Sequence, residues 1–493
     1  MTYPLLYEIN TRCWLQRLGA EAGRPITLGN VPEAEFDRWS RWGLTHLWLM
    51  GIWSTGPQAR ALAQTEPHQR RLYDEVLPGW QLQDVDGSPY AIADYRLAAR
   101  LGTDEDLADF RRRLHARSLR LILDFVPNHL GIDHAWVRRS AKLFVQSSAL
   151  RPGTFAQPTE PGSRWLAHGK DPYFPPWVDT VQVDYRLASA REAMIGLLES
   201  VATRCDGVRC DMAMLLLEEV FAKTWKDFPP IPEAKSEGGE FWAEAIRNVK
   251  AAHPNFEFLG EAYWGLEPRL QDLGFDYTYD KELTDQLLAR DGAGVQRHLA
   301  KLSARQLAAG IRFLENHDER RVAGVLSLSE HQAAALLLLG LPGMRLLHEG
   351  QLEGARLRTP VQLTRRHTEP PQVPIQEMYQ RLLTLIATSA VGKGTATLLT
   401  PDPEGNLPCS EMVLVQWQAQ PEVIDLVAVN LAPDSRRCHA PLRLGDSRPG
   451  PWRITDGIGG GAQTHLGESL RQRGLCVDLP AHGVALYHCE ASP

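Results

Sequence analysis

Eight short apolar runs, separated by amphipathic segments, constrain the fold of this chain more than any other feature of its sequence. The runs lie at residues 5–10, 45–50, 119–126, 207–211, 256–262, 275–280, 311–316 and 344–350. Each is continuously apolar rather than alternating, which is typical of parallel strands covered on both faces. Helical periodicity runs between them, for example over 104–118, 189–204 and 241–253. This alternation predicts an α/β fold, a (β/α)8 TIM barrel.

A doubly wound sheet is the alternative for such an alternation. It normally carries a glycine-rich phosphate loop after an early strand, and no such loop follows the early strands here. The barrel is therefore the favoured architecture.

The pattern changes twice along the chain, which predicts three domains. Residues 130–181 are rich in Pro, Gly and aromatics and weak in periodicity, so we expect a small inserted domain after strand 3. From residue 391 onward, short strands separated by turns predict a C-terminal antiparallel β-sandwich. The barrel is then expected to comprise residues 1–129 and 182–390.

Charge and cysteine content exclude several classes of protein. The formal net charge is −7 and the basic clusters are short, so a nucleic-acid partner is not expected. No apolar run reaches the length of a membrane span, and no membrane partner is expected. The seven cysteines form no metal-type spacing, and the N-terminus lacks a secretory pattern. We therefore expect a soluble cytoplasmic protein; the oligomeric state is left open.

Polar and ionisable residues gather at the ends of four predicted strands, where the active site of such a barrel lies. Charged groups there cost free energy unless they are paired or used. Four strands that converge on one mouth in this way predict a site. The residues are Asp124, Asn128 and His129 after strand 3, Arg209 and Asp211 on strand 4, Glu261 on strand 5, and Glu315, Asn316, His317 and Asp318 on strand 7.

Two of these carboxylates suit glycoside hydrolysis with retention of configuration. That chemistry needs a nucleophile and an acid/base about 5 Å apart. Asp211 and Glu261 come from neighbouring strands, whose spacing is about 5 Å. Arg209 points to the same barrel face as Asp211 and is expected to keep it ionised, whereas burial beside other carboxylates should raise the pKa of Glu261. Asp318 can hold sugar hydroxyls and stabilise the transition state.

The four segments, in order, resemble the four recurrent motifs of glycoside hydrolase family 13, the α-amylase family. DFVPNH resembles the first motif, GVRCD the second, FLGEA the third and FLENHD the fourth. SPYAIADY resembles the stretch with a sugar-stacking tyrosine, VQVDY the weak motif at the end of the inserted domain, and VAVNLAP a strand of the C-terminal sandwich. The resemblance spans nearly the whole chain.

The resemblance implies a role for each residue that matches a motif. Asp211 would be the nucleophile, Glu261 the acid/base and Asp318 the transition-state stabiliser. The residues implied to surround the sugar on the non-leaving side are Tyr90, which would stack on it, His129, Arg209 and His317.

Departures from the family pattern affect calcium and acceptor binding. Met214 and Leu215 stand where calcium-binding members often carry a Lys-His pair, and Arg186 stands where the weak motif often has Asn or Asp. We therefore expect no cofactor and no metal, with no calcium at the usual site. Polar contacts to the leaving side are lost as well, so acceptor recognition must come from other residues, of which Tyr263, Trp264, Tyr173, Phe174 and Trp177 are candidates.

The resemblance implies an α-retaining hydrolase that acts on α-1,4-glucans or maltooligosaccharides through a covalent glycosyl-enzyme. A 4-α-glucanotransferase or maltosyltransferase is the alternative, since LQDLGFDYTYDKEL resembles the maltosyltransferase branch. A non-catalytic scaffold of the family is a more distant alternative, because all three carboxylates and Arg209 are present. An aldolase-type barrel would need a lysine at a strand end, and none is evident.

Each residue also has a structural interpretation. Asp211 or Asp318 could cap the helix that follows it, Arg209 could form a purely structural ion pair, and Glu261 could be a surface carboxylate. For His348 and Glu349, near strand 8, a structural role is favoured.

Overall fold

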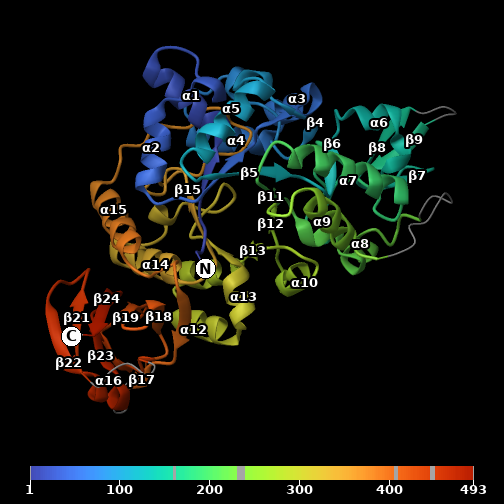
Figure 1. The fold of residues 1–493 in the computed structure, drawn as a ribbon. Coiled ribbons are helices and arrows are strands. Elements are labelled where there is room, and N and C mark those ends of the chain that lie inside the picture. The colour runs from blue at the N-terminus through green and yellow to red at the C-terminus, as the bar shows by residue number, and fades with distance from the viewer. Residues whose placement is uncertain (1, 159–162, 230–238, 405–408, 445–449, 492–493) are drawn as a thin grey trace.

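The computed structural model describes residues 2–158, 163–229, 239–404, 409–444 and 450–491. Its centre is a closed barrel of eight parallel strands (Figure 1), which confirms the predicted fold class. Seven of the eight predicted apolar runs contain one of these strands, and the seventh run along the chain, 311–316, overlaps the last two residues of β14. Around the barrel they are β1 (Leu5–Asn10), β15 (Met344–His348), β14 (Gly310–Arg312), β13 (Tyr277–Tyr279), β12 (Glu257–Gly260), β11 (Gly207–Cys210), β5 (Arg120–Phe125) and β2 (His46–Met50).

The strands are apolar on both sides because the barrel has two cores. Side chains that point inward, such as Leu6, Trp48 and Leu346, fill the barrel itself. Those that point outward, such as Leu47 and Leu123, pack beneath the surrounding helices. The two faces alternate along each strand, as the pleat requires, so Glu8 on β1 lies on the inward side.

Helices surround the barrel in the order expected of a β/α repeat. The three helices predicted by periodicity are present as α5, α7 and α9. The helices of this part of the chain are α1 (Thr11–Ala22), α2 (Glu33–Arg41), α3 (Pro57–Thr65), α4 (Pro67–Val76), α5 (Asp104–His115), α7 (Ala188–Ala202), α8 (Glu218–Thr224), α9 (Phe241–Ala252), α10 (Glu267–Asp272), α11 (Lys281–Leu288), α12 (Gly292–Lys301), α13 (Ala304–Ala309), α14 (Leu328–Gly340) and α15 (Val373–Thr388).

The chain between β5 and β11 leaves the barrel and forms short strands of its own. A three-stranded sheet in the order β7-β9-β8 and a β10-β6 pair stand to one side of the barrel in Figure 1. Their elements are β6 (His129–Gly131), α6 (Ala135–Arg139), β7 (Gln146–Ser147), β8 (Thr154–Pro158), β9 (Ser163–Ala167) and β10 (Thr180–Gln182). Residues 159–162, within the predicted insertion, lie outside the described residues. The domain boundaries remain a prediction.

The C-terminal part is antiparallel, as predicted. Its two sheets have the orders β16-β18-β19-β24-β21-β22 and β17-β20-β23. The elements are β16 (Thr395–Leu399), β17 (Asp402–Pro403), β18 (Met412–Gln420), β19 (Val423–Asn430), β20 (Arg436–Ala440), β21 (Pro451–Asp456), β22 (Ala462–Leu466), α16 (Gly467–Arg473), β23 (Leu475–Leu479) and β24 (Val484–Ala491). An antiparallel β3–β4 pair, Trp53–Thr55 with Ile92–Leu97, lies near the barrel.

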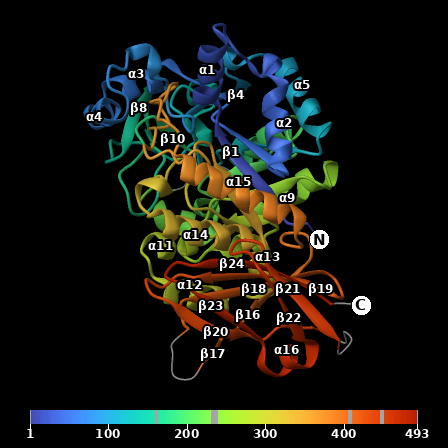
Figure 2. The same cartoon turned by 90° about the vertical axis from the view of Figure 1, so that its left-hand side faces the viewer.

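Helix α14 of the barrel packs against strands β19 and β24 of the C-terminal sheet (Figure 2). Its last two turns read AAALLLLG and are buried on every side, as expected for a helix enclosed between two layers. Gly340 ends the helix against Val427 of β19, and a Cβ added at Gly340 would lie 2.7 Å from Val427 Cγ1. The Trp417 indole donates a hydrogen bond to the Gly340 carbonyl. The barrel and the sandwich therefore pack closely at this point.

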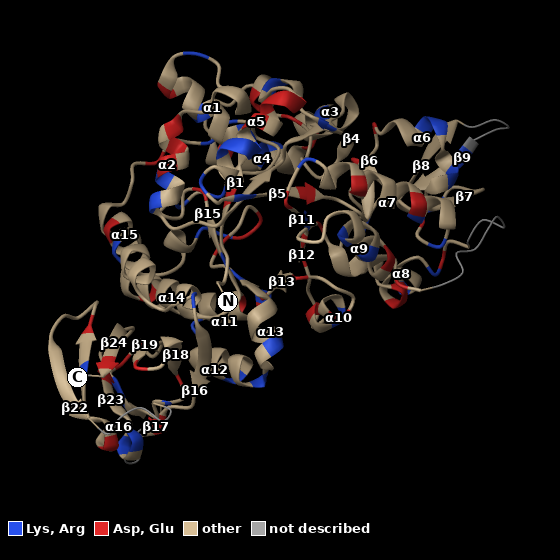
Figure 3. Cartoon of the chain, viewed as in Figure 1, with Lys and Arg blue, Asp and Glu red and all other residues tan. Residues whose placement is uncertain are grey.

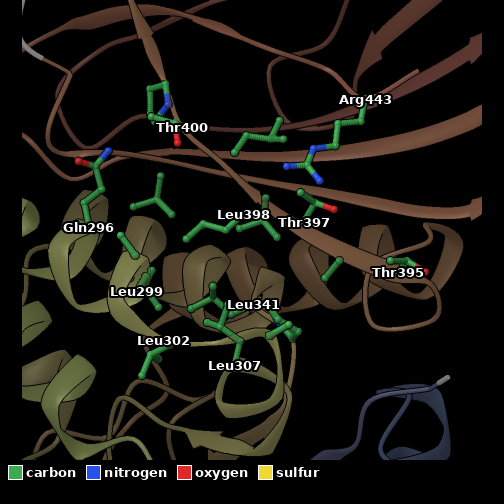
Figure 4. Close-up of a pocket in the computed structure, with 18 of the residues that line it drawn as sticks. Gln296, Leu299, Leu302, Leu307, Leu341, Thr395, Thr397, Leu398, Thr400 and Arg443 are labelled. Atoms are coloured by element: carbon green, nitrogen blue, oxygen red, sulfur yellow. The ribbon is translucent and has the colours of Figure 1, made fainter. Parts of the chain in front are cut away.

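A leucine-lined cleft of about 760 Å³ lies beside this junction, between α12 and β16 (Figure 4). Acidic and basic residues are interspersed over the whole molecule in Figure 3. The seven cysteines are free thiols, and Cys205 and Cys210 are buried, in line with a packing role. Within the described residues, no helix combines the length and apolar character needed to cross a membrane.

Candidate active site

The four predicted strand ends, those of β5, β11, β12 and β14, lie at one mouth of the barrel, because all strands of this closed barrel run parallel. Arg209 lies between the two carboxylates predicted to react. Its Nη1 donates to Asp211 Oδ1 at 2.6 Å, and its Nη2 lies 2.7 Å from Glu261 Oε2. The two nitrogens share one carbon atom, so the two carboxyl groups must lie close together. Both side chains are more than nine-tenths buried.

The turn after β11 supports this pair. Met212 has φ +45°, a left-handed backbone conformation that is rare for residues other than glycine. Its backbone amide donates to Glu261 Oε2 at 2.7 Å, and the Tyr263 hydroxyl donates to Glu261 Oε1 at 2.7 Å. Asp211 accepts from Arg209, and the short helix that follows begins after Met212. The helix-cap interpretation of Asp211 is therefore not needed to explain its position.

Burial governs the protonation of the two carboxyl groups. It raises the pKa of both Asp211 and Glu261, and the Arg209 charge opposes this rise in each. Each negative charge also makes the other harder to form, so the two groups titrate as a pair. The expectation of a raised pKa holds for Glu261. Arg209 is expected to keep Asp211 ionised, and its charge and its hydrogen bond both lower the pKa of Asp211 against the larger effect of burial.

Arg209 is itself enclosed by aromatic rings. Its guanidinium carbon lies 5.3 Å from the ring centre of Trp48, 5.4 Å from that of Tyr90 and 5.7 Å from that of Tyr279. Its Nε also donates to the Tyr279 hydroxyl at 3.3 Å. A cation over the faces of aromatic rings in a desolvated site is attracted by their quadrupoles. These contacts hold the guanidinium, and with it the two carboxylates, in place.

The third carboxylate stands on the open side of the site. Asp318 is half exposed, and its Oδ2 lies 3.0 Å from His317 Nε2. Burial of its surroundings would raise the pKa of Asp318, but the charge of His317 outweighs this and holds it below its ordinary value. Asn316 Oδ1 accepts from the Asp318 and Glu319 amides, so Asn316 closes the turn and leaves the Asp318 carboxylate available.

His317 is held between two carboxylates. Its Nδ1 lies 2.5 Å from Glu8 Oε1, and its ring stacks on Tyr90 with ring centres 5.3 Å apart. Burial would lower the pKa of His317, yet Asp318 and Glu8 together raise it well above its ordinary value. The imidazole is therefore a cation beside the reacting pair. The Tyr90 hydroxyl lies 2.7 Å from His317 Nε2.

His129 has the opposite character. Burial lowers its pKa to about 4, so this imidazole is neutral. Its ring lies 5.0 Å from that of Trp177, a residue of the inserted segment. The structure thus places all seven predicted site residues at or beside one mouth of the barrel: Tyr90, His129, Arg209, Asp211, Glu261, His317 and Asp318.

Two buried carboxylates belong to the site and were not predicted as site residues. Glu8, on the inward face of β1, partners His317; a lone acid inside an apolar strand was the signal for it. Asp124, noted only as a strand-end residue, accepts from the Trp48 indole and the Gly51 amide. Burial raises the pKa of Asp124 to about 7.

His348 and Glu315 form a separate network behind the site. Arg321 Nη1 donates to Glu315 Oε1 at 2.6 Å and lies 2.9 Å from His348 Nδ1. Both residues are buried. These contacts agree with the structural role favoured for His348.

A groove of about 870 Å³ begins beside Glu261, at Met212 and Tyr263, which both donate hydrogen bonds to its carboxylate. Met212, Tyr263 and Tyr279 form its inner end. Phe174 and Trp264 line it further out and are 70 % and 42 % exposed. Tyr173, from the inserted segment, packs against Trp264 with ring centres 5.0 Å apart. Exposed aromatic faces beside a catalytic pair are suited to sugar rings.

N–H donors and apolar side chains surround the positions at which the sequence departs from the family's calcium-binding pattern. Gln182 Nε2 donates to both the backbone and the side-chain oxygen of Asn128. The Arg186 guanidinium pairs with both carboxylate oxygens of Asp184. Met214 and Leu215 are buried among apolar side chains. The side-chain oxygens of Asn128 and Asp184 are thus engaged by N–H donors.

Comparisons with known proteins agree with this geometry. The model of the "Alpha amylase, catalytic domain" family matches residues 43–369, about two thirds of the chain. The chain is 23 % identical over 448 residues to a cyclomaltodextrinase of Geobacillus thermopakistaniensis, covering 86 % of this chain and 69 % of that protein. It is 22 % identical over 290 residues to alpha-amylase 3 of Dictyoglomus thermophilum, where the match spans about half the length of each, 54 % of both.

The fold has close counterparts among solved structures. The noncanonic maltogenic alpha-amylase AmyB from Thermotoga neapolitana superposes with a TM-score of 0.69 at 18 % identity, over 99 % of each chain. At this identity the likeness concerns the fold. It extends over the barrel, the inserted segment and the C-terminal sandwich alike.

Proposed function

Because the chain belongs to the α-amylase family of glycoside hydrolases, we propose that it cleaves α-1,4-glucans or maltooligosaccharides with retention of configuration, through a covalent glycosyl-enzyme on Asp211. The observation that carries this proposal is the single guanidinium of Arg209, which holds the Asp211 and Glu261 carboxyl groups side by side. Such proximity suits a retaining enzyme, because an inverting enzyme needs room for a water between its two carboxyl groups.

The two carboxyl groups have different parts in this mechanism. Asp211 attacks the anomeric carbon of the sugar, and Glu261 donates its proton to the departing glycosidic oxygen. In the second step Glu261 takes a proton from the attacking water. The water oxygen forms a bond to the anomeric carbon while the bond between that carbon and Asp211 breaks. The raised pKa of Glu261 supports its part, since an acid must carry its proton near neutral pH.

The surrounding residues stabilise charge and hold the sugar. Asp318, ionised and half exposed, is placed to accept hydroxyl hydrogen bonds and to stabilise positive charge on the ring. His317 and neutral His129 can bond to hydroxyls on the non-leaving side. Arg209 offsets the negative charge of the pair. Tyr90, whose ring already stacks on His317, closes that side of the site.

Product analysis with maltoheptaose tests the proposal. The protein is incubated with this oligosaccharide, and product masses are followed over time. We expect shorter oligosaccharides, and we expect Asp211→Asn to lose at least about a thousandfold in rate because the covalent step has no substitute. An unchanged substrate on several α-glucans, or an active Asp211→Asn variant, would contradict the proposal and favour a non-catalytic scaffold.

Transfer to a sugar acceptor is the second candidate, and the aromatic groove favours it. Hydrolysis and transfer share the glycosyl-enzyme and differ only in whether water or a sugar hydroxyl attacks it. A sugar held against Trp264 and Phe174 would lie in the groove that begins at Met212 and Tyr263, beside the acid that protonates the leaving group. In the same experiment, products longer than maltoheptaose indicate transfer. Trp264→Ala should then reduce the ratio of longer to shorter products.

We also propose that this member works without calcium at the family's usual site. The donor groups of Gln182 and Arg186 support this, because they occupy the oxygens of Asn128 and Asp184. Activity on maltoheptaose should be unchanged after treatment with a chelator. A loss of activity that added calcium restores would contradict this proposal.

A further inference from the structure

The six-stranded sheet of the C-terminal part ends in an exposed edge strand, β22. Figure 3 shows β22 and β16 at opposite ends of this sheet, with β16 beside α12 of the barrel. Within the part of the chain that the structure describes, β22 pairs with no strand other than β21, in a regular register over all five of its residues. Four of the five are exposed, and Leu466 is 64 % exposed. The outer side of β22 therefore offers backbone N–H and C=O groups for pairing.

Other edge strands of this protein carry the features that normally prevent such pairing, which are charges, prolines or short length. In the second C-terminal sheet, the edge strand β17 consists of Asp402 and Pro403 alone. The other edge strand of that sheet, β23, carries Asp478 opposite Arg437. In the inserted segment, the edge strand β8 ends with Pro158. By contrast, β22 has the sequence AQTHL, with neither a charge nor a proline.

The opposite edge of the same sheet is less open. Strand β16 is also uncharged, but its residues line the leucine-rich cleft together with α12 and α13 (Figure 4). A strand that approached β16 would have to enter between the sheet and these helices. A contact between β22 of one molecule and β16 of the next would also be head-to-tail, and repetition of such a contact gives filaments unless its rotation closes a ring. These considerations favour pairing of β22 with β22.

The sequence of β22 suits an antiparallel pair with itself. A two-fold axis through Thr464 places this residue opposite its own copy. It also places Ala462 opposite Leu466, and Gln463 opposite His465, of the second copy. The first of these contacts covers the exposed Leu466 side chain, and Thr–Thr pairs are favourable across strands. Gln463 Oε1 and His465 Nε2 already lie 3.1 Å apart along the strand, and an amide and an imidazole have the groups to exchange hydrogen bonds across it as well.

The charges near β22 do not oppose this arrangement. Thr464 lies in one row of the sheet with Arg453 of β21 and Glu490 of β24. Across the axis the row continues in reverse order, so the two copies of Arg453 are separated by three strand spacings, about 14 Å. Charges at that separation are largely screened at physiological ionic strength, where the Debye length is about 8 Å. No pair of like charges therefore meets at the contact.

We propose that two copies of this chain associate through β22, in an antiparallel strand pair centred on Thr464 that joins their six-stranded sheets into one continuous sheet. Such a contact is isologous and closes on itself, so it produces a dimer. One strand pair buries less than the roughly 1,200–2,000 Å² of a standard stable interface, so the dimer is weak and depends on protein concentration. The inference does not depend on the proposed catalytic function.

Sedimentation equilibrium between about 1 µM and 1 mM protein tests the association. We expect the mean mass to rise toward that of a dimer. Thr464→Lys places two like charges opposite each other and should weaken the dimer at least tenfold, whereas the uncharged, β-branched Thr464→Val should retain it. The matched control, Thr395→Lys, adds the same charge at an exposed position of β16 and should leave the dimer intact. Thermal unfolding of each variant checks the fold.

Crosslinking tests the register of the pair without adding charge. Thr464→Cys places two thiols on the axis, with Cα atoms about 5 Å apart, a separation that a disulfide spans. Diamide, which takes up the two electrons and two protons, should therefore give a covalent dimer. In Gln463→Cys the two thiols lie diagonally, with Cα atoms about 8 Å apart, and should not be bridged. Six of the seven native cysteines are buried, so the unmodified protein should give little crosslinking.

Several results would overturn the inference. They are a monomer over the whole concentration range, a dimer that Thr464→Lys leaves unchanged, and a dimer that Thr395→Lys dissociates. Equal crosslinking of the Thr464→Cys and Gln463→Cys proteins would reject the register. If Thr464→Lys fails to fold, the crosslinking comparison decides by itself.

Discussion

Arg209 organises the catalytic centre at the residue scale. One guanidinium contacts both reacting carboxyl groups and lies over three aromatic rings, and it is 1 % exposed. Because burial raises the pKa of both acids, this cation limits how far the pair is neutralised. Double displacement at an anomeric carbon requires one proton donor and one anion, and Arg209 stabilises the anion of the pair.

Tyr263→Phe should move the basic limb of the pH profile to higher pH. The Tyr263 hydroxyl donates to Glu261 Oε1 and so favours the ionised form of Glu261. Without it the pKa of Glu261 rises further, and the acid keeps its proton to a higher pH. A hydrogen bond to a charged group is worth roughly 1.5 kcal/mol, equivalent to about one pH unit. The dependence of kcat/KM on pH measures this, and a shift to lower pH would contradict it.

Glu8→Gln should move the basic limb of the pH profile to lower pH. Glu8 helps to raise the pKa of His317. The variant lowers that pKa, so His317 loses its charge at a lower pH and Asp318 loses its cationic partner. We expect about a tenfold loss of kcat/KM above neutral pH and a destabilisation of about 3 kcal/mol. Glu35→Gln is the control, because Glu35 is a buried, paired carboxylate far from the site; it should lose stability without any change in the pH profile.

The sequence predicted the site residues that lie at the ends of strands, but not Glu8, which lies inside a strand. Asp211, Glu261 and Asp318 follow apolar runs, where a charged group stands out. Glu8 lies within an apolar run, where one acid could equally be a satisfied core residue. Its partner His317 is 309 positions away in the chain. Only the closure of the barrel brings the two together.

At the scale of elements, strand pairing sets the geometry of the site. Cys210 on β11 pairs with Gly260 on β12, so the residues that follow, Asp211 and Glu261, emerge side by side. Gly260 itself packs against the Phe275 ring, which a Cβ would approach to 3.0 Å. The left-handed turn at Met212 then directs an amide back to Glu261. Adjacent strands thus supply both carboxyl groups and part of their hydrogen bonding.

Gly340→Ala should destabilise the protein, whereas Gly196→Ala should stabilise it. A Cβ at Gly340 would lie 2.7 Å from Val427 where α14 meets the C-terminal sheet, so the packing must shift at a cost of about 1–3 kcal/mol. Gly196 lies on the exposed face of α7, and a Cβ there meets nothing within 4 Å. Alanine at that helical position should gain about 0.5–1 kcal/mol. Thermal unfolding of the two variants checks both signs; a lower midpoint for Gly196→Ala, or an unchanged one for Gly340→Ala, would refute this packing.

At the scale of the whole molecule, hydrophobic periodicity predicted the repeating strands and helices of the barrel, but it did not predict the structure of the inserted segment. Eight apolar runs and the helices between them specify a barrel, because burial on both faces leaves a pattern in the sequence. The segment 130–181 has no such pattern, so its three-stranded sheet and its contact with His129 through Trp177 could not be read from it.

The anomeric configuration of the first product tests the central claim most directly. Proton NMR, recorded immediately after mixing with maltoheptaose and before mutarotation, distinguishes α from β reducing ends. A pair of carboxyl groups bridged by Arg209 predicts that the newly released sugar is the α anomer. Initial release of the β anomer would show that water attacks directly, and it would contradict the assignment of Asp211 and Glu261 as nucleophile and acid/base.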